Sequence, residues 1–208
     1  MRVLLRVVWG LMALALVANW SPNPAFGLAY DESVHGDLSG TPAAPTLLGI
    51  AHVITLTGSA GGGDFDLFKL QLPIGASIDS IVLDSYSGTS RSFMAVQSNT
   101  SQWTAGLGGG VNATALLGWT HFGPAEASNG AGIGDNILDN MGSGFGATGF
   151  TPPITGASPI LFLIQDTGGR IDYQMTIRML TVPEPSGMVM SALAALCMIA
   201  RRNFRVNP

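Results

Sequence analysis

Residues 171–179 read IDYQMTIRM, and this stretch decides the class of fold. Apolar side chains occupy every second position from Ile171 to Met179, and polar side chains occupy the positions between them. Successive side chains of a β-strand point to opposite faces of a sheet, so this alternation predicts a strand with one buried face. The preceding loop, DTGGR at 166–170, predicts a hairpin with the strand-like run ILFLIQ at 160–165.

Short runs of the same kind recur earlier in the chain, separated by Gly, Ser and Asn. In residues 64–72 the apolar face changes between Leu67 and Phe68, which indicates either a β-bulge or a strand buried on both sides. This spacing of strands and turns predicts an all-β domain, a β-sandwich or jelly roll, over residues 30–182. The other predicted strands are residues 52–57, 64–72, 77–83 and 92–97.

Composition supports an exported, turn-rich β domain. The 208 residues include 28 glycines and only 11% charged residues, and glycine is disfavoured inside helices. The one cysteine, Cys197, lies in the C-terminal apolar segment, so the predicted domain has no disulfide and no cysteine metal site. Between residues 30 and 182, four basic residues stand against twelve acidic ones, a net charge of −8. Such a surface repels phosphate backbones, so we expect no nucleic-acid partner.

The N-terminus has the pattern of a secretory signal peptide. A short region with two arginines precedes an uninterrupted apolar run at 7–18. This run is shorter than the about 20 residues that a membrane-spanning helix needs. We therefore predict a signal peptide over residues 1–29, cleaved after Ala29, with cleavage after Ala25 as the alternative.

The C-terminal residues 183–208 have three parts in a fixed order. Pro183-Glu184-Pro185 forms a stiff strip, because proline donates no backbone hydrogen bond and restricts the residue before it to extended conformations. Residues 187–200 carry no charge, and as a helix they would be about 21 Å long, against a hydrocarbon core of about 30 Å. Bilayer thinning and snorkelling arginines would close this gap, so we predict a C-terminal transmembrane helix with a cytoplasmic basic tail. The basic residues of the tail are Arg201, Arg202 and Arg205.

This ordered combination of signal peptide, Pro-Glu-Pro, apolar helix and terminal arginines resembles the PEP-CTERM proteins. In that family the tail is a sorting signal recognised by an exosortase, a membrane protease of Gram-negative bacteria that is thought to cut near the Pro-Glu-Pro. The resemblance implies Pro183, Glu184 and Pro185 as the recognition and cleavage region. It also implies a precursor anchored in the inner membrane and a product at the cell surface or in the extracellular matrix. The apolar part is somewhat shorter than is usual in the family.

A second resemblance concerns the predicted domain. Residues 61–83 contain GGGDFDLF, then LPIG, then an Ile-x-x-Ile-x-Leu strand, and this order is similar to bacterial pre-peptidase C-terminal-type domains. The final IQDTG and YQMTI segments fit the same pattern, so the match spans about residues 50–180. Such domains are small jelly rolls appended to secreted enzymes and are generally non-catalytic, which implies binding or structure rather than chemistry.

The sequence contains no constellation typical of catalysis. None of the three histidines stands in a close metal spacing such as HExxH. Gly142-Ser143-Gly144 lacks the strand–turn–helix frame of a nucleophile elbow. We therefore expect a protein that is not an enzyme, with a hydrolase as the weakest hypothesis. The histidines are His35, His52 and His121.

Two pairs of carboxylates are weak candidates for a Ca²⁺ site. Asp64 and Asp66 belong to one predicted strand face, and Asp135 and Asp139 lie in a short Asp- and Asn-rich run. Oxygen ligands on an exported acidic domain suit Ca²⁺. Turn formation and helix capping explain Asp and Asn in such places more often, so we expect no cofactor.

The Gly-rich stretch between residues 99 and 159 is the candidate ligand surface, since binding residues often lie on loops carried by a rigid scaffold. Its aromatic residues Trp103, Trp119 and Phe122 would suit stacking on sugar rings, and core packing is the alternative. Two hypotheses follow. The first is a structural or interaction protein of the cell surface or matrix, with the exosortase and the membrane as its partners during sorting. The second is a carbohydrate-binding or adhesive module of the exopolysaccharide matrix.

Overall fold

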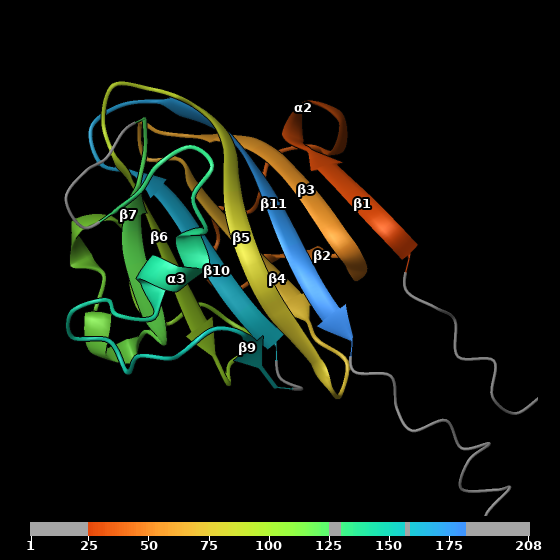
Figure 1. Cartoon of the computed structure of the whole chain (residues 1–208). Coiled ribbons are helices and arrows are strands. Elements are labelled where there is room, and N and C mark those ends of the chain that lie inside the picture. The colour runs from red at the N-terminus through yellow and green to blue at the C-terminus, as the bar shows by residue number, and fades with distance from the viewer. Residues whose placement is uncertain (1–24, 125–129, 157–158, 182–208) are drawn as a thin grey trace, which may run out of the picture. The chain divides into compact units, whose positions relative to one another are not determined.

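The computed structural model describes residues 25–124, 130–156 and 159–181 (Figure 1). The Pro-Glu-Pro strip, the apolar C-terminal segment and most of the predicted signal peptide therefore lie outside the described residues. Within the described ranges, no helix combines the length and apolar character needed to cross a membrane.

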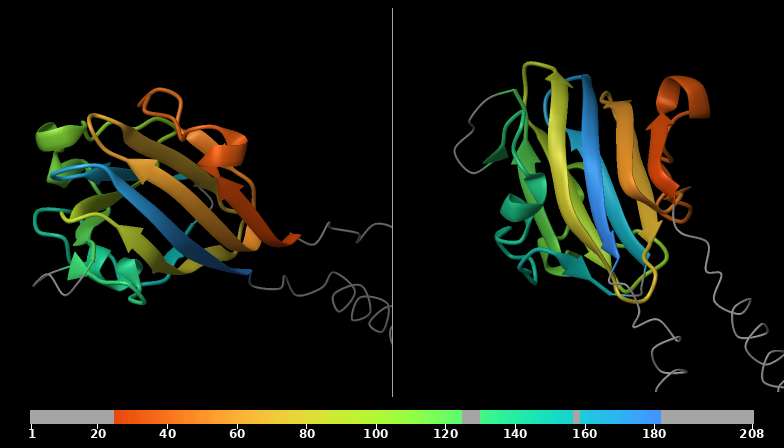
Figure 2. Two further views of the ribbon diagram at one scale, coloured as in Figure 1. Left: turned by 90° about the horizontal axis from the view of Figure 1, so that it is seen from above. Right: turned by 45° about the vertical axis from the view of Figure 1, so that its right-hand side comes forward.

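The described chain forms two β-sheets that pack face to face, which confirms an all-β sandwich (Figures 1 and 2). The first sheet consists, in order of neighbouring strands, of β1 (Ala25–Asp31), β3 (Ala51–Ala60), β11 (Ile171–Thr181), β5 (Ala76–Ser87) and β9 (Ile154–Thr155). The second consists of β2 (Thr46–Leu48), β4 (Phe65–Gln71), β10 (Pro159–Asp166), β6 (Ser92–Ser98), β7 (Gly118–Phe122) and β8 (Gly130–Ala131). The short helices are α2 (Glu32–His35), η1 (Gly108–Gly110), η2 (Ala113–Ala115) and α3 (Ile137–Met141).

The alternating stretch at 171–179 is confirmed as a strand, and it lies in the middle of the first sheet between β3 and β5. Its apolar side chains are buried in the core between the sheets. The core contains their counterparts from the second sheet, such as Phe68 and Phe162, whose stacked rings have centroids 5.0 Å apart. The buried members of the stretch are Ile171, Tyr173, Met175, Ile177 and Met179.

The predicted hairpin at 166–170 is wrong. β10 pairs with β4 and β6 in the second sheet, whereas β11 pairs with β3 and β5 in the first. Both are interior strands of their sheets, so residues 167–170 carry the chain from one sheet to the other across an end of the sandwich. Both strands have an apolar face toward the same core, so packing them in opposite layers buries those faces as well as pairing them would.

β4 is buried on both sides, which was one of the two alternatives for residues 64–72. Its pairing with β10 runs from Gln71 to Phe65 without a change of register, so the change of apolar face requires no bulge between these strands. Phe68 points into the core between the sheets, and Leu67 belongs to a second apolar cluster on the outer face of the second sheet. The loop segment at 103–116 covers that outer cluster with Trp103, Ala105 and Leu116.

Candidate functional site

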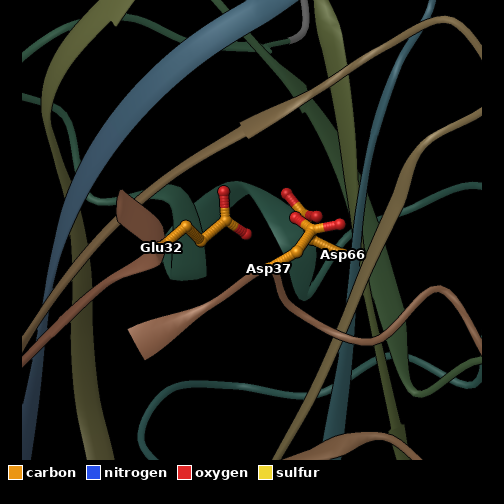
Figure 3. A group of neighbouring side chains, drawn as sticks. All are labelled: Glu32, Asp37 and Asp66. Carbon is orange, nitrogen blue, oxygen red and sulfur yellow. The ribbon is translucent and has the colours of Figure 1, made fainter. Parts of the chain in front are cut away.

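Three carboxylates lie close together beside the edge of the sandwich (Figure 3). Glu32 is the first residue of α2, Asp37 follows that helix, and Asp66 is on β4. One carboxylate oxygen from each can be chosen so that the three atoms all lie within 4.8 Å of one another. We call these residues the carboxylate cluster. In this cluster, the segment after β1 lies next to β4 of the second sheet.

Local structure after β1 places Glu32. Asp31 caps α2, because its Oδ1 accepts hydrogen bonds from the Ser33 amide at 2.9 Å and the Ser33 hydroxyl at 2.7 Å. The helix ends after one turn at Gly36, whose φ of +90° suits a residue without a side chain. The chain then turns back, and Leu38 packs into the core.

Backbone amides from two segments hold the Glu32 carboxylate. Oε1 accepts a hydrogen bond of 3.0 Å from the Leu38 amide, and Oε2 accepts one of 2.7 Å from the Ser59 amide on β3. Partial burial raises the pKa of Glu32 above its usual value, and these two amides act against that rise. Both oxygens keep further acceptor capacity, because a carboxylate oxygen can accept more than one bond.

The missing side chain of Gly58 makes room for this arrangement. A Cβ atom at Gly58 would lie 2.6 Å from the Tyr173 hydroxyl oxygen and 2.9 Å from Glu32 Cδ. Gly58 pairs directly with Tyr173 across β3 and β11. A larger residue at this position would therefore displace the groups that hold the cluster.

Asp66 is the buried member, with an exposed fraction of 0%. Its Oδ2 accepts a hydrogen bond of 2.7 Å from the Tyr173 hydroxyl, while its Oδ1 has no hydrogen-bond partner among the described residues. Burial raises the pKa of Asp66 to about 8, with the negative charge of Glu32 as the next cause. Burial also holds the pKa of the Tyr173 hydroxyl well above its usual value. A buried carboxylate with a free oxygen is an unfavourable arrangement unless another group satisfies it.

No basic side chain in the described part of the chain forms an ion pair with the cluster. Arg170 lies nearby, but its recorded ion pair, 3.7 Å from Nε to Oδ1, is with Asp172, and both side chains are exposed. Glu32 and Asp37 line an open pocket of about 390 Å³, together with Asp31, Ser33, the 57–59 stretch, Arg170 and Asp172. The cluster is therefore rich in carboxylate oxygens, partly buried and reachable from solvent.

The sequence prediction found one member of this cluster and missed two. Asp66 belongs to it, whereas Asp64, predicted with it, lies just before β4 and outside the three-residue set. Asp64 is still close enough for the charge of Asp37 to contribute to raising its pKa, after burial as the main cause. Glu32 and Asp37 were missed because nothing local connects them with a residue about 30 positions later. The local signal that could have indicated them was the group of three acidic residues within positions 31–37.

The second predicted carboxylate pair has local structural roles. Asp135 Oδ2 accepts a hydrogen bond of 2.7 Å from the Gly132 amide and so closes a turn. Its neighbour Asn136 caps α3 by accepting from the Leu138 amide at 3.2 Å. Asp139 is exposed in the first turn of α3, where the helix dipole favours an acidic residue. Neither Asp135 nor Asp139 belongs to a metal-compatible group in the described residues.

The three predicted stacking residues do not form one surface. Trp103 is 4% exposed in the outer cluster, and Phe122 is 1% exposed in the core between the sheets. Trp119 is partly exposed, and its Nε1 donates a hydrogen bond of 3.0 Å to the Phe145 carbonyl oxygen. Trp119 and the exposed Phe145 line a pocket of about 530 Å³ with Thr120, Gly130, Asn140, Ser143 and Gly144.

Two of the three histidines pack against aromatic rings. His35 stacks on Tyr30 with ring centroids 5.2 Å apart, and His121 meets Trp119 edge to face at 5.6 Å. Within the described ranges, no histidine belongs to a metal-compatible group.

Compared with known proteins, the sequence matches no family model, and no curated protein matches it.

Proposed function

We propose that this protein is exported, sorted by an exosortase and delivered to the cell surface or extracellular matrix, where it has a structural or interaction role and is not an enzyme. The observation that carries the proposal is that the two predicted signals flank the sandwich in the sequence. β11 ends at Thr181, and Pro183 follows two residues later. Cutting near the Pro-Glu-Pro would therefore leave the sheets complete.

The position of β1 favours the earlier of the two signal-peptide cleavage sites. β1 runs from Ala25 to Asp31 and pairs with β3 along its length. Cleavage after Ala29 would remove five of its seven residues, whereas cleavage after Ala25 would remove one. We therefore place the N-terminus of the mature protein at Phe26.

Replacing Pro183, Glu184 and Pro185 together with alanine tests the sorting proposal. We expect export to continue and an unprocessed, membrane-bound precursor to accumulate, because the protease loses its recognition strip. The matched control is Ser186→Ala, which changes the adjacent residue and keeps the Pro-Glu-Pro. The intact mass of the protein from its native host is the measurement, and unchanged processing of the triple variant would refute the proposal.

Carbohydrate binding is the second candidate function, and the pocket at Trp119 and Phe145 favours it. An exposed aromatic ring beside Asn and Ser side chains offers both a stacking face and hydrogen-bonding groups for a sugar. Binding of the protein to exopolysaccharide from the same host can be measured by affinity electrophoresis. Phe145→Ala should weaken that binding, because Phe145 is exposed in this pocket. Phe122→Ala would not test sugar binding, because Phe122 is buried in the core and its loss would affect folding. Retention that does not depend on Phe145 would count against this candidate.

A further inference from the structure

We propose that Glu32, Asp37 and Asp66 bind one Ca²⁺ ion, which joins the segment after β1 to β4. This inference concerns the sandwich itself and does not depend on how the protein is sorted. It rests on the geometry of the cluster, on one buried oxygen that lacks a partner and on the chemistry of the donor set.

The spacing of the three oxygens suits a single ion. Ca²⁺ binds oxygen ligands at about 2.3–2.6 Å, so ligands on opposite sides of the ion are about 5 Å apart. Three carboxylate oxygens that all lie within 4.8 Å of one another therefore fit around one ion without a rearrangement of the backbone. Glu32, Asp37 and Asp66 come from the helix, the following loop and β4, so the ion would join parts of the chain that are distant in sequence.

The free oxygen of Asp66 is an independent indication of a ligand. Oδ1 is buried and has no hydrogen-bond partner among the described residues, although Tyr173 satisfies Oδ2 on the same carboxylate. An ionised Oδ1 would be a buried charge without a partner, and a protonated one would be a buried donor without an acceptor. A cation beside Oδ1 would remove both problems.

The hydrogen bonds around the cluster hold its carboxylates in fixed orientations, as the outer partners of metal ligands do. The Leu38 and Ser59 amides orient the Glu32 carboxylate, and the Tyr173 hydroxyl orients Asp66. Outer partners of this kind fix the direction of ligand oxygens and are a regular part of metal sites. Asp37 is exposed, and it would complete the site from the solvent side, where water can supply the remaining ligands.

The donor set points to calcium. All three ligands are carboxylates, and the group contains no histidine or cysteine, so a hard cation is favoured over zinc or copper. Mg²⁺ requires a near-ideal octahedron at about 2.0–2.1 Å, whereas Ca²⁺ tolerates irregular sites with six to eight oxygens. A site that combines a fixed strand residue with an exposed loop residue suits the more tolerant ion.

Calcium titration of the full chain, purified in mild detergent and stripped with a chelator, tests the proposal. We expect isothermal titration calorimetry to give one Ca²⁺ per chain and the thermal unfolding midpoint to rise with Ca²⁺ concentration, because the ion binds the folded state. Mg²⁺ should bind more weakly. Absence of both binding heat and a shift in the midpoint would overturn the proposal, and equal affinity for Mg²⁺ would overturn the assignment to calcium.

Asp37→Asn is the decisive variant. Asp37 is exposed, and its side chain makes no hydrogen bond in the described part of the structure, so the metal-free variant should fold like the wild type. Its Ca²⁺ affinity should fall at least about tenfold, since even outer-shell changes cost this much. Asp66→Asn should abolish binding, and if that variant does not fold, Asp37→Asn still decides the question.

Asp139→Asn is the matched control, because it removes the same charge from another exposed position outside the cluster. It should bind Ca²⁺ like the wild type. If Asp37→Asn keeps wild-type affinity, or if Asp139→Asn loses as much affinity as Asp37→Asn, the proposed site is wrong.

Discussion

The Tyr173 hydroxyl donates a hydrogen bond of 2.7 Å to Asp66 Oδ2, and this bond joins the two sheets of the sandwich. Tyr173 lies on β11 in the first sheet, and Asp66 lies on β4 in the second. Both side chains are buried within a core that is otherwise mainly apolar. The bond therefore fixes how the sheets meet next to the carboxylate cluster.

Tyr173→Phe should destabilise the protein by about 1–3 kcal/mol, because it leaves a second oxygen of Asp66 buried without a partner. Urea unfolding followed by circular dichroism gives the free energy of unfolding. A double-mutant cycle with Asp66→Ala isolates the pairwise contribution, and we expect the two changes to be strongly non-additive. Additive effects would mean that the hydrogen bond contributes little to stability.

The metal-free protein should lose stability as the pH rises from about 4 to about 8. The pKa of Asp66 is about 8 in the folded state and about 3.9 in an unfolded chain, so the folded state holds the proton more tightly. This contribution is fully present below pH 4, falls as the pH rises through the folded pKa and is absent above it. This difference of about four between the two pKa values corresponds to at most about 6 kcal/mol of unfolding free energy.

Free energies of unfolding measured across this pH range, with a chelator present to keep the protein metal-free, will test the direction of this change. Asp66→Asn is the matched variant, because it keeps an oxygen acceptor for Tyr173 and cannot ionise. Its stability should change much less between pH 5 and pH 8 than that of the wild type. A wild-type stability that increases over this interval would contradict the prediction.

Gly58→Ala should lower both stability and Ca²⁺ affinity. The new methyl group would meet the Tyr173 hydroxyl and the Glu32 carboxylate, and such overpacking costs about 1–3 kcal/mol. Gly109→Ala is the control, because no heavy atom lies within 4 Å of its Cβ position and its φ is not positive. Equal thermal midpoints for the two variants would show that the contact at Gly58 relaxes without cost.

Trp103→Ala should be strongly destabilising, by about 3–5 kcal/mol, because it removes a buried aromatic side chain from the outer cluster. It also removes the indole hydrogen bond of 2.6 Å to the Gly106 carbonyl, which helps to hold the covering loop. Trp119→Ala should cost less, since Trp119 is only partly buried. Chemical unfolding of both variants checks this order, and the reverse order would mean that the covering loop contributes little to stability.

The alternation of residues 171–179 was enough to predict a buried strand, because side-chain direction in a strand is a local property. The same local pattern did not reveal the sheet to which each strand belongs. The loop at 166–170 is compatible with a hairpin and with a crossing between sheets, and only long-range pairing separates β10 from β11. The sequence indicated that β4 has a second apolar face. It did not indicate that the segment around Trp103 packs on that face.

The sequence by itself determined the all-β class, the acidic charge of the domain and the two terminal patterns that motivate the sorting proposal, because each depends on composition or on neighbouring residues. The tertiary structure alone decided that Trp103 and Phe122 are core residues and that Glu32 and Asp37 meet Asp66. These contacts depend on strand pairing and sheet packing between segments about 26 to 125 residues apart. No local pattern encodes that geometry, so the carboxylate cluster exists only in the folded chain.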